Sequence, residues 1–179
     1  MSILLKIARD ITEISYTQMC EIYETTILAD AATNFGAMDS NLAVILAQQD
    51  LYGYLRQVFF KVSGARCGFW IVDDVACAAL RIEPYDEGYL ISGLETAPDK
   101  RRKGYAEALV RSTVAYLFAE GVLRVYAHVM KENISSMNLH SKVGFQKISE
   151  KATFIDGTVS ADACTFCLKF DWKDSGKSC

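Results

Sequence analysis

The sequence has little proline and no positive net charge, and each shortage excludes a class of protein. Two prolines occur among 179 residues, and the formal net charge is −3 at pH 7. Because proline is scarce and no low-complexity tract occurs, we expect no long disordered region. A mildly acidic chain also lacks the basic surface that general nucleic-acid binding needs, so no nucleic-acid partner is expected.

Long apolar runs are missing as well. No run approaches the roughly 20 residues that cross a bilayer, so no membrane partner is expected. The first eleven residues include Lys6, Arg9 and Asp10 and therefore lack the uninterrupted apolar core of a signal peptide. The sequence thus predicts a cytoplasmic protein.

The six cysteines are expected to be free thiols, which fits a reducing compartment. The spacing of Cys164 and Cys167 suggests a metal or redox site. They lie, however, in a segment that alternates like a strand, so their thiols should point to opposite faces of the sheet. No second pair occurs at zinc-site spacing. We therefore predict no metal site.

Apolar residues make up 51% of the chain, enough to fill one sizeable core. We expect a single domain over residues 1–171, with residues 172–179 as a frayed tail. The spacing of apolar residues predicts a strand at 4–8, a first helix capped by Asp10 or Thr12, and a loop or broken helix at 28–40. Ser40 or Asn41 should open a longer helix, whose expected buried stripe consists of Leu42, Ile45, Leu46, Leu55 and Phe59.

The remaining segments alternate between strands and helices. Two apolar runs flank Asp73-Asp74, which is a hairpin signal, and a third strand ends before Pro98. A helix at 104–120 separates this strand from another at 122–130, and a short helix ending at Gly144 precedes a last strand pair. This order is typical of an α/β domain of the α+β type, in which helices flank a mixed, mostly antiparallel sheet.

The most distinctive stretch is the turn before the 104–120 helix, where four cations at 100–103 precede Gly104. The N–H groups at a helix N-terminus suit a phosphate or diphosphate, and the small residues Gly104 and Ala106 would let it approach. Arg101, Arg102 and Lys103 could add charge-assisted hydrogen bonds. The dinucleotide and Walker fingerprints do not match, because the turn has one glycine and Tyr105 follows it. A solvated basic loop is the alternative.

Two stretches resemble conserved motifs of the GNAT superfamily of acyl-CoA-dependent N-acyltransferases. Residues 101–106, RRKGYA, resemble its R/Q-x-x-G-x-G/A signature, and residues 133–145, NISSMNLHSKVGF, resemble its second conserved stretch. The resemblance implies a central sheet splayed between two strands and acetyl-CoA as cosubstrate. It further implies transfer of an acetyl group to a primary amine, on a small molecule or a protein, by direct attack in a ternary complex. Dimers are common in such folds, so a homodimer is possible.

The resemblance also implies a set of cofactor contacts. The turn and the first helical residues would bind the diphosphate of coenzyme A, and the strand end would pair with its pantetheine arm. Asn133 would bind near the sulfur, or merely cap the helix after it, and Ser136 would line the same wall, or be a neutral surface residue. The predicted cofactor-binding residues are Leu94, Glu95, Thr96, Arg101, Arg102, Lys103, Gly104, Tyr105, Ala106, Asn133 and Ser136.

Two side chains are the predicted catalytic residues. His140 stands where the family commonly has the Tyr that protonates the departing thiolate; a cationic imidazole could do the same, although a packing role is the alternative. Glu95 is the predicted base, provided that its surroundings are apolar enough to raise its pKa; its alternative is a carboxylate that points to solvent or pairs with a cation. His128 is expected to be a partly buried structural residue with its hydrogen bonds satisfied, and a role in the site is the alternative.

The resemblance also implies that the acceptor enters beside two segments, which here carry the acidic residues Asp30, Asp39, Asp156 and Asp162. A cationic amine would be attracted there. The alternative function is a non-catalytic acyl-CoA-binding or regulatory module, in which His140 marks a lost acid.

Overall fold

The computed structural model describes residues 2–170 of the chain. They form two compact units: one comprises the residues up to Arg81 together with Gly93–Leu109, and the other comprises Ile82–Ser92 and the residues from Val110 onward. The single domain predicted over residues 1–171 stays a prediction beside this division. The tail predicted at 172–179 lies outside the described residues.

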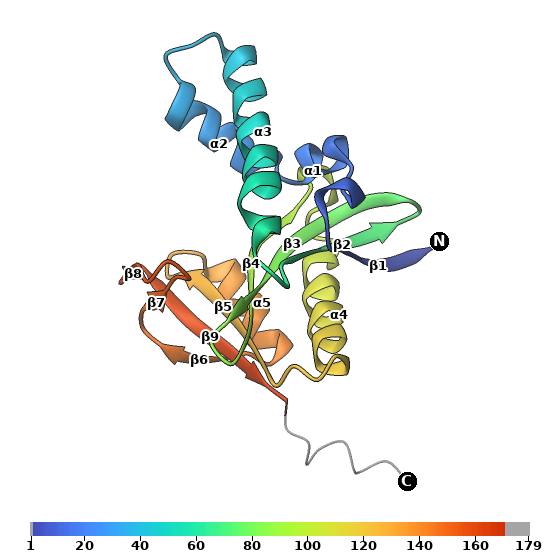
Figure 1. Cartoon of the computed structure of the whole chain (residues 1–179), viewed down its shortest axis with the longest axis vertical. Helices are drawn as coiled ribbons and strands as arrows, with labels where there is room; N and C mark the ends of the chain where they lie inside the picture. The colour runs from blue at the N-terminus through green and yellow to red at the C-terminus, as the bar shows by residue number, and fades with distance from the viewer. Residues whose placement is uncertain (1, 171–179) are drawn as a thin grey trace. The chain divides into compact units, whose positions relative to one another are not determined.

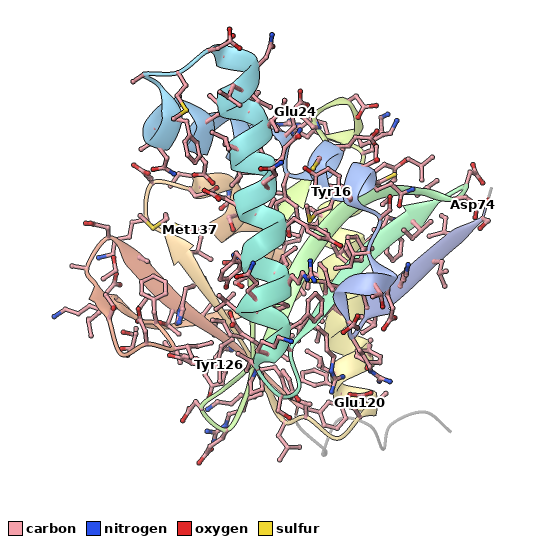
Figure 2. The ribbon with its side chains drawn as sticks, turned by 45° about the horizontal axis from the view of Figure 1, so that its top comes forward. Tyr16, Glu24, Asp74, Glu120, Tyr126 and Met137 are labelled. Atoms are coloured by element: carbon pink, nitrogen blue, oxygen red, sulfur yellow. The ribbon has the colours of Figure 1, made fainter. Side chains whose placement is uncertain are left out.

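The first unit contains the N-terminal strands. β1 (Ile3–Ala8) pairs antiparallel with β2 (Arg66–Val72), and β3 (Val75–Tyr85) follows (Figure 1). Asp73 and Asp74 both have positive φ, 48° and 64°, as a two-residue hairpin with the right-handed twist of its strands requires. Figure 2 shows Asp74 at the tip of this hairpin. The predicted hairpin is confirmed.

Helices complete the first unit. They are η1 (Ile11–Glu13), α1 (Tyr16–Ile22), α2 (Glu24–Phe35), α3 (Ser40–Gln57), η2 (Phe59–Lys61) and η3 (Pro98–Lys100). The predicted cap at Asp10 belongs to the short η1, and Ser15 caps α1 instead. The loop or broken helix predicted at 28–40 is wrong for most of its length, because α2 continues through its alanine-rich segment to Phe35.

The stripe predicted for α3 is partly wrong. Leu42 and Ile45 are 47% and 48% exposed, whereas Ala43, Ala47 and Leu55 are buried. α2 and α3 form a helical hairpin (Figure 1), and small side chains on the α3 face let the two helices approach closely. The larger residues are therefore displaced outward. The buried core of this unit also includes Met19, Ile22, Phe59, Phe69 and Ala79.

The second unit is built on the C-terminal strands. β4 (Gly88–Thr96) begins in this unit and lies parallel to β5 (Arg124–Met130) over the three pairs from Tyr89–Val125 to Ile91–Ala127. β5 pairs antiparallel with β9 (Ala163–Lys169), which also pairs with β6 (Gln146–Ser149). Two short strands, β7 (Ala152–Thr153) and β8 (Val159–Ser160), form a separate ladder.

The strand order is β1-β2-β3-β4-β5-β9-β6. The helices that follow β4 and β5 are α4 (Tyr105–Ala119) and α5 (Ile134–Val143), and α5 ends at Gly144 as predicted. The mixed, mostly antiparallel sheet with flanking helices confirms the predicted fold class. Within residues 2–170, no helix has both the length and the apolar character of a membrane span.

The start of α3 provides a stability test. The Asp39 carboxylate accepts hydrogen bonds from Asn41 N (3.0 Å) and Leu42 N (3.2 Å), so Asp39, rather than Ser40 or Asn41, is the cap. Asp39→Ala should lower the free energy of unfolding by about 1 kcal/mol in urea denaturation. Asp50→Ala, at an exposed site inside α3, is the control and should change it by less than about 0.5 kcal/mol. Equal effects of the two variants would contradict the capping role.

Candidate active site

The turn that enters α4 has an unusual backbone. Arg102 has a φ of 63° and Gly104 a φ of 81°, so two of three consecutive residues are left-handed. α4 then starts with the hydrogen bond from Ala108 N to Gly104 O at 3.0 Å. Left-handed residues alternating with others turn successive N–H groups toward one side, which is how backbone amides form an anion site. A left-handed arginine also costs free energy, and such strain concentrates at functional sites.

The basic side chains of this turn are partly engaged within the protein. Arg101 donates from Nε to Thr96 O (3.2 Å) and from Nη2 to Thr25 Oγ1 (2.6 Å). Lys103 Nζ donates to Asp99 O at 3.3 Å, and Lys100 pairs with the Asp99 carboxylate at 2.7 Å. Arg101 therefore fastens the turn to α2 and to the end of β4, a role that the sequence did not suggest.

Glu95 lies near the end of β4 with its carboxylate half-buried. Thr26 Oγ1 of α2 donates a hydrogen bond to Glu95 Oε1. Burial raises the pKa of Glu95, while the Thr26 hydrogen bond and the positive charges of Arg101 and Arg81 oppose that rise. The net direction is upward, as a base for amine deprotonation requires.

A cavity of about 90 Å³ lies beside Glu95 within the first unit. The Arg81 guanidinium also lines it, and its Cζ lies 5.4 Å from the centre of the Tyr54 ring. Tyr23 is buried, which raises the pKa of its hydroxyl, and it donates to Gly93 O at 2.7 Å. Sequence reasoning missed Arg81, Tyr23 and Thr26. Arg81 did leave a signal, because it is an isolated cation in the apolar run 75–82.

A larger, more open hollow of about 700 Å³ lies elsewhere in the first unit. Its lining includes Tyr16 and Glu24, which Figure 2 labels, together with Ala97 and Lys100 ahead of the α4 turn. Tyr16 packs edge-on against Tyr52 of α3, with ring centres 5.3 Å apart. Among the described residues, the buried side-chain atoms without a hydrogen-bond partner are Arg81 Nε, Thr113 Oγ1 and His128 Nε2. None of these belongs to the larger hollow.

Asn133 and His140 lie in the second unit. Asn133 Oδ1 accepts from Ser136 N at 3.0 Å, so Asn133 caps α5, which was the alternative to its cofactor role. His140 is 4% exposed and packs edge-on against Phe145, with ring centres 5.2 Å apart. Its Nδ1 lies 2.8 Å from Ser136 O, and burial lowers its pKa. A neutral, buried imidazole favours the packing role over that of a general acid.

Two of the acidic residues predicted near the acceptor serve local structure. Asp39 caps α3, and Asp156 accepts from Thr158 N at 2.9 Å in the β7–β8 turn, which lowers its pKa. His128 is half-buried as predicted, with its Nδ1 3.2 Å from Thr165 Oγ1, but its Nε2 lacks the expected partner among the described residues. Cys164 and Cys167 are buried free thiols three residues apart on β9.

Comparison with known proteins identifies the family. The profile of the acetyltransferase (GNAT) family matches residues 28–145. The N-acetyltransferase YobR of Bacillus subtilis is 29% identical over 99 residues, which are 55% of this chain and 40% of YobR. The match therefore spans less than half of that relative.

Solved structures agree with the observed architecture. The PaiA N-acetyltransferase of Thermoplasma acidophilum, in complex with coenzyme A, has a TM-score of 0.63 at 12% identity, covering 95% of this chain and 100% of that one. The N-acetyltransferase PseH of Campylobacter jejuni, in complex with acetyl coenzyme A, has a TM-score of 0.59 at 16% identity, with the same coverage. At these identities the likeness establishes the fold. Together with the family match, it shows that the chain belongs to the GNAT acetyltransferase family, which confirms the resemblance seen in its two motifs.

The burial of His140 predicts a pH dependence of stability. Its folded pKa lies below the usual 6.5, so the unfolded chain binds the proton more readily. The contribution of His140 to the free energy of unfolding is therefore fully present above about pH 6.5, and it is lost as the pH falls toward the folded pKa. For the His140→Phe variant, the free energy of unfolding measured by urea denaturation should decline less steeply than for the wild type between about pH 7.5 and about pH 5.5.

His128 is the comparison, because burial lowers its pKa as well. His128→Asn should remove the part of the pH dependence of unfolding that His128 contributes. If His140→Phe kept the full wild-type slope, the buried neutral imidazole would be refuted.

Proposed function

We propose that this chain transfers an acetyl group from acetyl-CoA to a primary amine. The observation that carries the proposal is the turn at Arg102–Gly104, in which two left-handed residues come directly before the N-terminus of α4, a backbone arrangement that suits an anion. Glu95, a half-buried carboxylate with a raised pKa, belongs to the same unit. PaiA and PseH, which share the fold, were crystallised with coenzyme A and acetyl coenzyme A.

In the proposed site, the N–H groups of residues 102–106 bind the diphosphate of the cosubstrate. The backbone of Leu94 and Thr96 holds the pantetheine arm, as the edge of a strand can. Acetyl-CoA supplies an activated acetyl group as a thioester. Cofactor contacts of Asn133 and Ser136 stay predictions, as do a homodimer and a cytoplasmic location.

Glu95 acts as the base. An amine of ordinary pKa is mostly protonated at neutral pH and cannot attack, so its proton must leave first. The carboxylate takes that proton, the amine nitrogen bonds to the acetyl carbon, and the carbon–sulfur bond breaks. As the amide forms, the nitrogen releases its second proton to water, and the departing thiolate takes a proton from water, because a buried neutral His140 is a poor donor.

The buried His140 favours one second candidate, an acyl-CoA-binding module without turnover. The two differ in one measurement: release of free thiol from acetyl-CoA over a panel of amines. Thiol release that requires an amine supports the enzyme. Tight cofactor binding with no thiol release from any amine supports the binding module.

Gly104→Asp tests the cofactor turn. The substitution puts a side chain at a φ of 81° and a negative charge at the amides, so the affinity for coenzyme A should fall by roughly 100-fold in calorimetry. Gly121→Asp is the matched control, because Gly121 has a φ of 86° and a Cβ added at either glycine would meet no atom within 4 Å beyond its chain neighbours. Equal loss of affinity in both variants, or none in a folded Gly104→Asp, would refute this assignment.

Glu95→Gln tests the base. Turnover should fall by about 100-fold or more, while coenzyme A affinity is kept. In the wild type, kcat/KM should fall as the pH drops through the raised pKa of Glu95, since the protonated carboxyl accepts no proton.

Thr26→Val supplies the matched control for Glu95→Gln. It removes the hydrogen bond that lowers the Glu95 pKa, so the acidic limb of the kcat/KM profile should move to higher pH while turnover persists above it. An unmoved limb would mean that another group controls this part of the profile.

A further inference from the structure

Arg81 is a half-buried cation whose Nε atom is fully enclosed. Among the described residues, no oxygen accepts a hydrogen bond from this nitrogen, which is buried. The Tyr54 ring lies on one side of the guanidinium. The backbone of Gly93 lies close on another, because a Cβ on Gly93 would be 2.7 Å from Nε. The same Cβ would be 2.9 Å from Nη2, so Gly93 covers the Nε edge and a ligand must approach the Nη donors. The protein thus holds the guanidinium in place and leaves the enclosed Nε unsatisfied, which is rare and costly.

Arg81 and Glu95 both line one cavity. Its volume of about 90 Å³ exceeds what a single water needs and is below the roughly 150 Å³ of a cavity that admits benzene. Most of its other lining is apolar: Met19, Leu51, Leu55 and Phe69. It thus offers one cation, one carboxylate and room for a small group.

The remaining hydroxyls of the lining are already engaged. Tyr23 donates to Gly93 O and Thr26 to Glu95 Oε1. An occupant is therefore recognised chiefly by the two charged groups. A compound with both charges matches them, whereas a simple alkylamine leaves Arg81 unsatisfied and brings a second cation beside it.

We propose that the acceptor is a small compound that carries a carboxylate next to its primary amine, of which a free α-amino acid is the simplest case. Its carboxylate binds the Nη donors of Arg81, which are not enclosed as Nε is, and its amine faces Glu95. Arg81 is the specificity-determining residue and Glu95 the proton acceptor. This inference rests on the proposed acetyl transfer and assigns its acceptor class.

The test compares amines in matched pairs with acetyl-CoA and follows free thiol. The pairs are glycine with methylamine, glycine with glycinamide, and alanine with ethylamine. In the wild type, kcat/KM should be at least about tenfold higher for the acid-bearing member of each pair. If the amines without a carboxylate do as well or better, the inference is overturned while the acetyl transfer stands. Equal use of glycinamide would point instead to the N-terminus of a peptide.

Substitutions at Arg81 provide the second readout. Arg81→Met should abolish the preference through a raised KM for glycine and alanine. It should also move the acidic limb of the pH profile of kcat/KM to higher pH, because the Arg81 charge lowers the pKa of Glu95. Arg81→Lys, which keeps the charge without the fork, should leave the limb in place and still weaken amino-acid binding. Arg56→Gln, at an exposed arginine of α3, is the control and should change neither.

Calorimetry with glycine and alanine separates the two proposals. Arg81-dependent binding without any thiol release would keep the inference about the ligand and refute the acetyl transfer. No binding and no acid-dependent turnover would refute the inference. Because the wild-type panel needs no variant, a misfolded Arg81→Met protein would not remove the test.

Discussion

The side chain of Arg101 joins the start of the α4 turn to the surroundings of Glu95. Its Nε donates to Thr96 O at the end of β4, and its Nη2 donates to Thr25 on α2. The next residue of α2, Thr26, donates to the Glu95 carboxylate. One guanidinium thus fixes how the chain leaves β4, and its charge opposes the effect of burial on the pKa of Glu95. A lysine could not hold these two acceptors with a planar fork.

Glu95 and Arg81 line one small cavity, and no ion pair joins them in the part of the chain that the structure describes. Burial is unfavourable for both charges. Two such groups bound to each other would be satisfied and chemically inert. Their separation leaves hydrogen-bonding capacity on each, and Met19 of the buried core lines the same cavity.

The strands, the hairpin at Asp73-Asp74 and the α4 turn could be predicted from the sequence because local rules determine them: alternation, turn residues and one helix start. The α3 face could not, since alanines pack where two helices approach closely, and only the tertiary contact shows that Leu42 and Ile45 are exposed. Glu95 could be singled out from the sequence because it lies at the end of the strand that leads into the RRKGYA motif. Arg81 and Thr26 could not be assigned, because their importance depends on which segments distant in sequence meet around one carboxylate.

Arg102 gives the turn a definite shape at the expense of local stability. Its left-handed backbone, with a φ of 63°, is disfavoured for any residue with a Cβ by about 1–2 kcal/mol. Glycine in its place would relieve that strain but would also let the segment sample many more conformations, both before and after folding. The arginine therefore restricts the conformations of the unbound turn, so that in the proposed diphosphate site little further conformational entropy would be lost on binding.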